Sequence, residues 1–236
     1  SATEEPGDAA SRRHERELEQ DVVTAIPNAE PGAELLRPAA VLGGAALEQR
    51  RTSTIGGTVA REAGVQSGTF GPAVGRPIIR GLEGARVQVL QSGVSSLDVS
   101  TVSADHAVTI EPFLADQIEI LKGPSTLLFG SGAIGGVVNM VDGRIAEAPV
   151  EGFGGRAELH GNTVNNERAG MVRLDAGNGA AAMHVDYARR DGDDFDLPDG
   201  TLLNSAIDQK SGAAGAGYAS DAGFLGLSFS RYDSLY

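Results

Sequence analysis

From position 150 onward, apolar and polar residues alternate along the chain with a period of two, and this alternation limits the fold more than any other feature. Met183, Val185 and Tyr187, for example, alternate with His184 and Asp186. Similar segments occur at 156–160 and 225–230, and weaker ones at 168–176 and 212–219. Strands of about 10 residues with one apolar and one polar face are typical of a transmembrane β-barrel. An antiparallel sheet with one solvated face shows the same alternation, so both folds stay open at this point.

The connections between these segments favour the barrel. The sequences at 177–179 and 220–223 are typical of tight turns, whereas the connection Asp191–Lys210 is long and acidic. Barrels of this kind have short turns at one rim and long loops at the other. The first connection, Thr163–Glu167, is short and fits this scheme less well.

These five segments are too few to close a large barrel. An open sheet edge cannot persist in hydrocarbon, because its backbone groups would have no hydrogen-bond partners there. We therefore expect a truncated β-barrel, which would be a truncated gene product, an engineered piece or part of a longer chain.

The zone before the alternating segments, from about Val41 to Arg144, has a different pattern. It predicts helices at 45–51 and 55–62 and strands at 86–90, 117–121 and 136–141. Ser53 or Thr54 can cap the second helix. Helices and strands mix without a regular βαβ rhythm, which predicts a small α+β domain rather than a doubly wound sheet.

The N-terminal segment is polar. Ser1–Gln20 has the composition of a disordered tail. A short β-prone segment, Asp21–Ile26, follows it and has no obvious strand partner. Such a segment is suited to pairing with the sheet of another protein, although it could also dock within its own domain.

Composition excludes several classes of function. The formal net charge of −13 argues against a nucleic-acid partner, because contacts with phosphates need clustered Lys and Arg. The chain has no cysteine, which excludes disulfides and thiolate metal sites. It shows no arrangement of nucleophile, histidine and acid and no fitting phosphate loop, so the sequence does not indicate an enzyme.

Three ordered stretches carry a family resemblance: IRG at 79–81, IEILKGP at 118–124 and GSGAIGGVVN at 130–139. In sequence and spacing they resemble the plug domain of TonB-dependent receptors, over about 19–144. The resemblance implies an α+β plug domain, a small mixed sheet with short helices, inside a plugged and roughly 22-stranded barrel. It implies a flexible tail at 1–40, the plug domain at 41–148 and the first barrel strands at 149–236. The protein would lie in the outer membrane of a Gram-negative bacterium, with its N-terminal tail facing the periplasm.

The same resemblance implies two macromolecular partners. The first is TonB, with its inner-membrane energising complex, which would pair edge to edge with a TonB box. The residues of this box are Asp21, Val22, Val23, Thr24, Ala25 and Ile26. The second partner is outer-membrane lipid around the barrel strands.

Single residues of the plug also receive expected roles. Arg80 and Glu119 are similar to charges that hold a plug against its barrel, the alternative being exposed surface charges. The glycines of the third stretch would allow turns and close backbone contact that a Cβ would obstruct. They are Gly130, Gly132, Gly135 and Gly136.

The segment 102–108, with 111–114 after it, is similar to the zinc-uptake branch of these receptors, the ZnuD type. In that branch an Asp-His pair of the plug is expected to face incoming metal, which here implies Asp105 and His106 as metal ligands. A carboxylate and an imidazole are both good Zn²⁺ ligands. A structural hydrogen-bonded pair is the alternative. Adjacent residues on an extended chain point to opposite faces, so both can bind one ion only if the backbone bends.

No prosthetic group is implied, and the transported ligand would be Zn²⁺. Haem, cobalamin or a ferric siderophore are alternative cargoes, and a soluble plug-like binding or signalling module is the alternative outside transport. The chain has only four histidines; His160 and His184 are predicted to lie on the polar, inward face of their strands. The acidic run Asp191–Asp196 could collect cations, or it could be a solvated loop.

Overall fold

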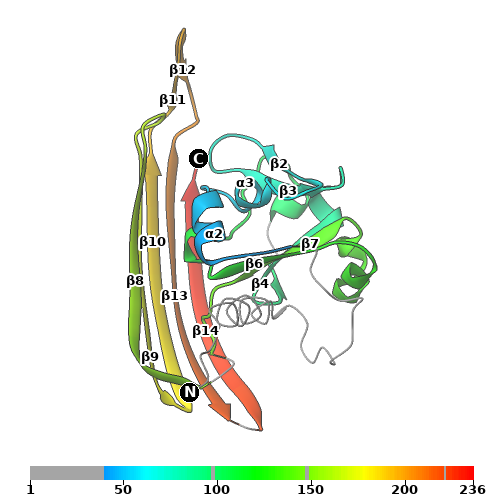
Figure 1. Cartoon of the computed structure of the whole chain (residues 1–236). Helices are drawn as coiled ribbons and strands as arrows, with labels where there is room; N and C mark the ends of the chain where they lie inside the picture. Colours follow the sequence, from blue (N-terminus) through cyan, green and yellow to red (C-terminus); the bar gives the residue numbers. More distant parts are fainter. Residues whose placement is uncertain (1–39, 97–98, 147–148, 221) are drawn as a thin grey trace, which may run out of the picture.

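A computed structural model describes residues 40–96, 99–146, 149–220 and 222–236 of the chain. Two parts pack against each other in it (Figure 1). Five long strands form a curved sheet, which we call the strand wall, and residues 40–146 form a smaller body of short strands and helices, which we call the N-terminal body. The segment Asp21–Ile26 lies outside the described residues.

The N-terminal body is built on a mixed five-stranded sheet with the order β1-β6-β7-β4-β5. Its strands are β1 (Ala40–Gly43), β4 (Val87–Gln91), β5 (Val94–Ser95), β6 (Gln117–Leu121) and β7 (Gly136–Val141). All of its pairs are antiparallel except β4 with β7. A separate antiparallel pair consists of β2 (Val65–Thr69) and β3 (Gly75–Ile79).

The helices of this body are short. They are α2 (Gly44–Arg50), α3 (Ile55–Val59) and the 3-10 helices η2 (Gly84–Arg86), η3 (Val99–Thr101), η4 (Pro112–Leu114), η5 (Pro124–Phe129) and η6 (Ser131–Ala133). Thr54 caps α3, because its side-chain oxygen accepts a hydrogen bond from the Gly57 amide at 3.2 Å. Within the described ranges, no helix is long and apolar enough to cross a membrane. A small mixed sheet with short helices confirms the predicted α+β domain.

The core of the N-terminal body covers both faces of its sheet. On one face, Ile118 and Ile120 of β6 belong to a buried cluster with Leu47 and Ile55 of the helices. On the other face, Leu121 belongs to a smaller cluster with residues of β4 and β7. Because both faces are covered, every residue of β6 after Gln117 is buried, including Glu119.

Two glycines let the strands of this sheet approach their neighbours closely. A Cβ on Gly135 would lie 2.9 Å from the carbonyl oxygen of Arg86, and one on Gly136 would lie 2.6 Å from Cδ1 of Ile79. Gly136 also has a φ of +154°, which L side chains rarely adopt. The predicted obstruction by a Cβ is therefore confirmed at these two positions.

The strand wall is antiparallel throughout, with the order β14-β13-β10-β9-β8. Its strands are β8 (Val150–Asn162), β9 (Glu167–Gly179), β10 (Ala181–Gly192), β13 (Ile207–Ser220) and β14 (Gly223–Leu235). The long connection between β10 and β13 carries the small hairpin β11 (Phe195–Leu197) and β12 (Gly200–Leu202). This hairpin projects from one end of the wall, the long-loop rim, and the tight turns lie at the other end, the short-turn rim (Figure 1). The predicted distribution of turns and loops is thus confirmed.

Alternate side chains of the wall point toward the N-terminal body or away from it. Those that point toward the body are mostly small or polar, and both His160 and His184 are among them, as predicted. Those that point away are largely apolar in the half of the wall nearer the short-turn rim. The exposed outward apolar residues there are Phe153, Val172, Leu174, Met183, Val185, Tyr187, Leu225, Leu227 and Phe229.

The acidic connection 191–196 has structural hydrogen bonds of its own. Oδ1 of Asp194 accepts bonds from the amides of Ser205 and Ala206, both at 2.7 Å. The carboxylate of Asp193 accepts a bond from the Asn166 side chain at 3.2 Å, which joins this loop to the first connection. These two carboxylates therefore close the loop, which favours a structural loop over a cation-collecting one.

Gly136→Ala is expected to destabilise the chain by about 2–4 kcal/mol, because the new methyl group collides with Ile79 and the backbone conformation is strained. Gly43→Ala is the matched control, since its Cβ would lie 3.8 Å from the nearest atom and its φ is −147°. Urea unfolding followed by circular dichroism measures both. Equal losses for the two variants would contradict the packing argument.

Candidate functional site

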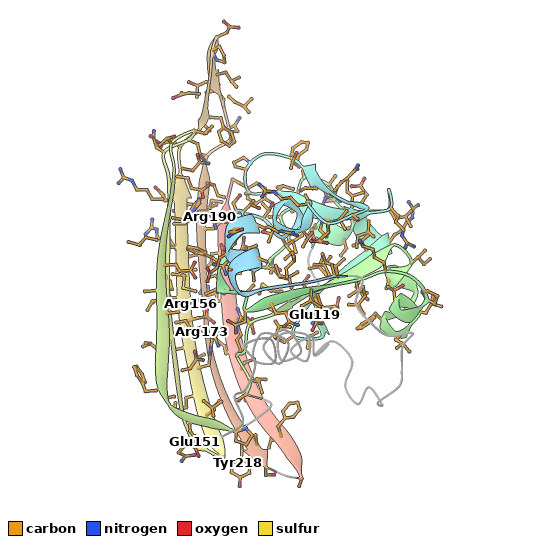
Figure 2. All side chains as sticks on the ribbon, in the orientation of Figure 1. Glu119, Glu151, Arg156, Arg173, Arg190 and Tyr218 are labelled. Carbon is orange, nitrogen blue, oxygen red and sulfur yellow. The ribbon has the colours of Figure 1, made fainter. Side chains whose placement is uncertain are left out.

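The N-terminal body meets the strand wall through two groups of charged side chains. The group nearer the long-loop rim, the Arg190 cluster, is centred on Arg190 of β10 (Figure 2). The Arg190 guanidinium forms ion pairs with Glu111 of the body, at 3.1 Å, and with Glu167 of β9. All three side chains are at most 7% exposed. Each of these buried charges therefore depends on the others for compensation.

An aromatic ring joins this cluster to a second arginine. Phe113 of η4 has the guanidinium carbon of Arg190 at 5.9 Å from its ring centre and that of Arg51 at 5.6 Å. Arg51 in turn reaches Glu158 of β8 at 2.7 Å. Burial lowers the pKa of Arg51 while Glu158 raises it, and the guanidinium stays charged. Cation–π contacts and ion pairs thus both hold η4 against the wall.

The second group is a series of alternating charges, which we call the charge chain. It begins at Asp116, just before β6, whose Oδ2 is 2.5 Å from Nη1 of Arg173 on β9. Nε of Arg173 is 2.7 Å from Oδ2 of Asp175, and Oδ1 of Asp175 is 2.8 Å from Nδ1 of His184 on β10. The body is thereby linked across two adjacent strands of the wall.

The charge chain continues from His184 back to the body. Nε2 of His184 is 2.8 Å from Oδ2 of Asp186, which lies 3.5 Å from Nε of Arg144 in the connection after β7. The same nitrogen of Arg144 is 3.0 Å from Asp142. Asp142 and Asp116 lie at the same end of the body sheet, where the Asp116 amide donates to the carbonyl of Val141 at 2.8 Å. The charge chain is therefore closed into a ring through the backbone.

The connection after β7 crosses the wall directly over β13. Gly215 is paired with His184, and a Cβ at Gly215 would lie 1.9 Å from the carbonyl oxygen of Arg144. Only a glycine leaves room for the backbone at this point. The Arg144 side chain is thus placed beside the wall by backbone packing as well as by charge.

Sequence reasoning missed both charged groups. A signal was present in the strands, because the inward positions 156, 158, 173, 175, 184, 186 and 190 are all charged or histidine rather than neutral polar. Their partners Glu111, Asp116 and Arg144 are far away in sequence, and only the topology of the body brings them to the wall. The pairs could not have been assigned without the fold.

The predicted metal pair, Asp105 and His106, lies in a bend of the backbone, where the His106 amide donates to the carbonyl of Ser103. The bend brings the two side chains together, with Nδ1 of His106 3.0 Å from Oδ1 of Asp105. Both side chains are about half exposed, at 52% for Asp105 and 48% for His106. The condition that the backbone must bend for both to face one ion is met.

Hydrogen bonds keep the Asp105 carboxylate in its charged form. The Ser103 hydroxyl and then the His106 ring are the main causes that lower the pKa of Asp105. The described part of the chain contains no group of three His, Asp or Glu residues placed to hold a metal ion. Asp105 and His106 could therefore supply two donors of a tetrahedral site, and the other donors would have to come from elsewhere.

The bend is tied to the end of the wall. The amide of Ala107 donates a hydrogen bond of 3.0 Å to the hydroxyl of Tyr236, which follows β14. This contact places the Asp105–His106 pair near the long-loop rim, on the inward side of the wall.

Arg80 and Glu119 occupy different environments within the body. Arg80 is exposed, and its amide donates to the carbonyl of Gly64 at 2.9 Å. Glu119 is fully buried in β6, where its carboxylate accepts hydrogen bonds from Gln117 at 2.9 Å and from Asn139 at 3.0 Å. Their role as plug–barrel contacts stays a prediction.

Comparison with known proteins gives one family match and several similar folds. Residues 32–137 match the family described as TonB-dependent Receptor Plug Domain. The copper transporter OprC has a similar fold, with 20% identity and a TM-score of 0.69 over 83% of this chain and 30% of that chain. The siderophore receptor PirA from Acinetobacter baumannii has 16% identity and a TM-score of 0.63 over 84% and 32%.

The pyoverdine outer membrane receptor FpvA from Pseudomonas aeruginosa PAO1 has 14% identity and a TM-score of 0.63 over 84% of this chain and 28% of its own. The present chain spans about a third of the length of these structures. The comparisons confirm the predicted fold, a plug domain followed by strands that resemble part of a receptor barrel.

Arg190→Ala is expected to weaken the attachment of the N-terminal body by about 3–5 kcal/mol, because it leaves Glu111 and Glu167 buried without a counter-charge. Arg189→Ala is the matched control. Arg189 is the neighbour in sequence, points outward and is 52% exposed, so its loss should cost less than about 1 kcal/mol.

The reporter is a fluorophore on Gln66→Cys, an exposed position of β2. This chain has no other cysteine. The urea midpoint for unfolding of the body should fall for Arg190→Ala only. Similar midpoints for the two arginine variants would contradict the role assigned to Arg190.

Proposed function

We propose that this chain, whose residues 32–137 match the TonB-dependent receptor plug domain, is the N-terminal part of a TonB-dependent outer-membrane transporter that imports scarce metal, with zinc as cargo. The packing of the two parts supports this proposal most directly. The N-terminal body covers the polar face of the strand wall and is fixed there by buried ion pairs. A domain held inside a barrel would likewise cover the polar inner face of the barrel wall and be fixed to it by polar contacts.

The outward face of the wall supports an outer-membrane location. Phe153, Leu225, Leu227 and Phe229 are each more than 70% exposed on it. A soluble protein rarely exposes so continuous an apolar surface, whereas lipid-facing strands of a barrel require one. Outer-membrane lipid is therefore the proposed partner of this face, and a soluble plug-like module is disfavoured.

TonB is the proposed partner of the segment Asp21–Ile26. This segment precedes β1, the edge strand of the body sheet. Force applied through the tail would reach β1 first and then β6, its only neighbour in the described sheet. The tail would face the periplasm, where TonB reaches it.

Zinc is the proposed cargo because of the donors at the bend near the long-loop rim. A carboxylate and an imidazole suit Zn²⁺, whereas a softer ion such as Cu(I) prefers thiolate or thioether ligands. The chain has no cysteine, and its three methionines lie elsewhere: Met140 and Met171 are buried, and Met183 points outward from the wall. Asp105 and His106 are the proposed first contacts of the ion.

The double variant Asp105→Ala/His106→Ala tests the cargo. In the full-length receptor, purified in detergent, we expect zinc affinity measured by calorimetry to fall by about 100-fold or more, because two ligands are lost. His160→Ala, which removes another exposed histidine, should bind zinc as the wild type does. If the wild type and the double variant bind alike, or neither binds, the pair is structural and haem, cobalamin and ferric siderophores become the cargoes to test.

Deletion of Asp21–Ile26 tests the energy coupling. The shortened receptor should bind zinc with unchanged affinity, because the segment is remote from Asp105 and His106 in sequence and precedes the body. In a strain that lacks the receptor, it should not restore growth when zinc is scarce. Restored growth would exclude these residues as the TonB box.

A further inference from the structure

We propose that His184 is a proton-dependent latch that holds the N-terminal body to the strand wall. Both ring nitrogens of His184 are 2.8 Å from a carboxylate oxygen, Nδ1 from Asp175 and Nε2 from Asp186. A neutral imidazole has one N–H and one lone pair, so it could donate to only one of these carboxylates. The geometry therefore corresponds to the imidazolium, which donates to both.

The charges around His184 explain why its proton matters. On its own strand it faces Asp186, and on β9 it faces Asp175 and, beyond it, Arg173. Arg144 approaches from the connection after β7, and β13 presents Gly215, which carries no charge. With His184 protonated, every neighbouring pair in the charge chain attracts. Without the proton, a lone pair faces one carboxylate, and two carboxylates flank a neutral ring.

His184 acts on the body through the two arginines. Asp175 and Asp186 hold Arg173 and Arg144, and these bind Asp116 and Asp142 at the end of the body sheet. His184 is only 3% exposed, so water cannot replace its bonds to the carboxylates without local opening. It is thus a positioning residue, since it orients the groups that touch the body. The latch would operate whatever cargo is carried.

The two attachments of the body differ in whether their charge changes with pH. The Arg190 cluster depends on a guanidinium, which stays protonated in proteins. The charge chain depends on the one side chain type whose charge ordinarily changes near neutral pH. The interface therefore combines a permanent attachment near the long-loop rim with a proton-dependent one nearer the short-turn rim.

The test compares the wild type with His184→Gln in the full-length receptor, with the fluorophore on Gln66→Cys as the reporter of body unfolding. Urea midpoints are measured from pH 5 to pH 10. At pH 5, His184→Gln should lower the midpoint by roughly 1 M, because the buried Asp186 and the partly exposed Asp175 lose the positive charge that lies between them. The difference in urea midpoint between the wild type and His184→Gln, which we call the gap, should narrow as the pH rises. The reason is that the native wild type loses the proton that stabilises it. Other titrating groups are common to both proteins and cancel in the gap.

His160→Gln is the matched control, since His160 lies on the same face of the wall but is exposed, and its midpoints should follow the wild type. Asp175→Asn keeps the imidazole and removes one of its carboxylates, and its pH dependence should be smaller than that of the wild type. A gap between wild type and His184→Gln that is absent, or that stays constant over the whole pH range, would overturn the proposal. So would a wild-type pH profile retained in full by Asp175→Asn.

Discussion

Arg190, Glu111 and Glu167 can be buried only as a set, because a buried charge without its partner costs several kcal/mol. The set takes one carboxylate from the N-terminal body and two charged groups from the strand wall. Without the wall, Glu111 has no counter-charge, and without the body, Arg190 keeps only Glu167 of its two carboxylates. The inward face of the wall therefore requires a body with matching charges, and the body is specified for this wall. The outward face has no such requirement and can be wholly apolar.

The environments of the two charged groups differ as much as their chemistry. Phe113 packs with Leu114, Ala169, Met171 and Ala188 in an apolar cluster beside Arg190, which excludes water from that attachment. The charge chain is buried from His184 to Asp142 but wetter at its other end, because Asp116 is 38% and Asp175 32% exposed. Electrostatic attraction is weaker where water enters. Position in the interface thus sets how far each attachment can respond to its surroundings.

Local sequence patterns predicted those parts of the fold that depend on local rules. β6 and β7 occur at the residues expected, and the inward face of the wall follows from its period of two. β1, β2 and β3 were not predicted, because each is short; β1 pairs with the distant strand β6, and β2 and β3 pair with each other. The Asp105–His106 pair was proposed because the segment around it resembles the zinc-uptake branch of TonB-dependent receptors. The pairing of Arg144 with Asp186 was not predicted, since it depends on how the connection after β7 crosses β13.

β1 has a mechanical consequence that follows from its place at the edge of the sheet. It has four residues and pairs antiparallel with β6, so that Ala40 lies opposite Ile120 and Gly43 opposite Gln117. A pull on the segment before Ala40 therefore loads the end of the pair farther from the wall. Pulled sideways, such a pair unzips one hydrogen bond at a time, at lower force than if all its bonds were sheared together. β1 would detach first, while β6 would stay attached beside Asp116. A small force could therefore open one edge of the body while the rest stays in place.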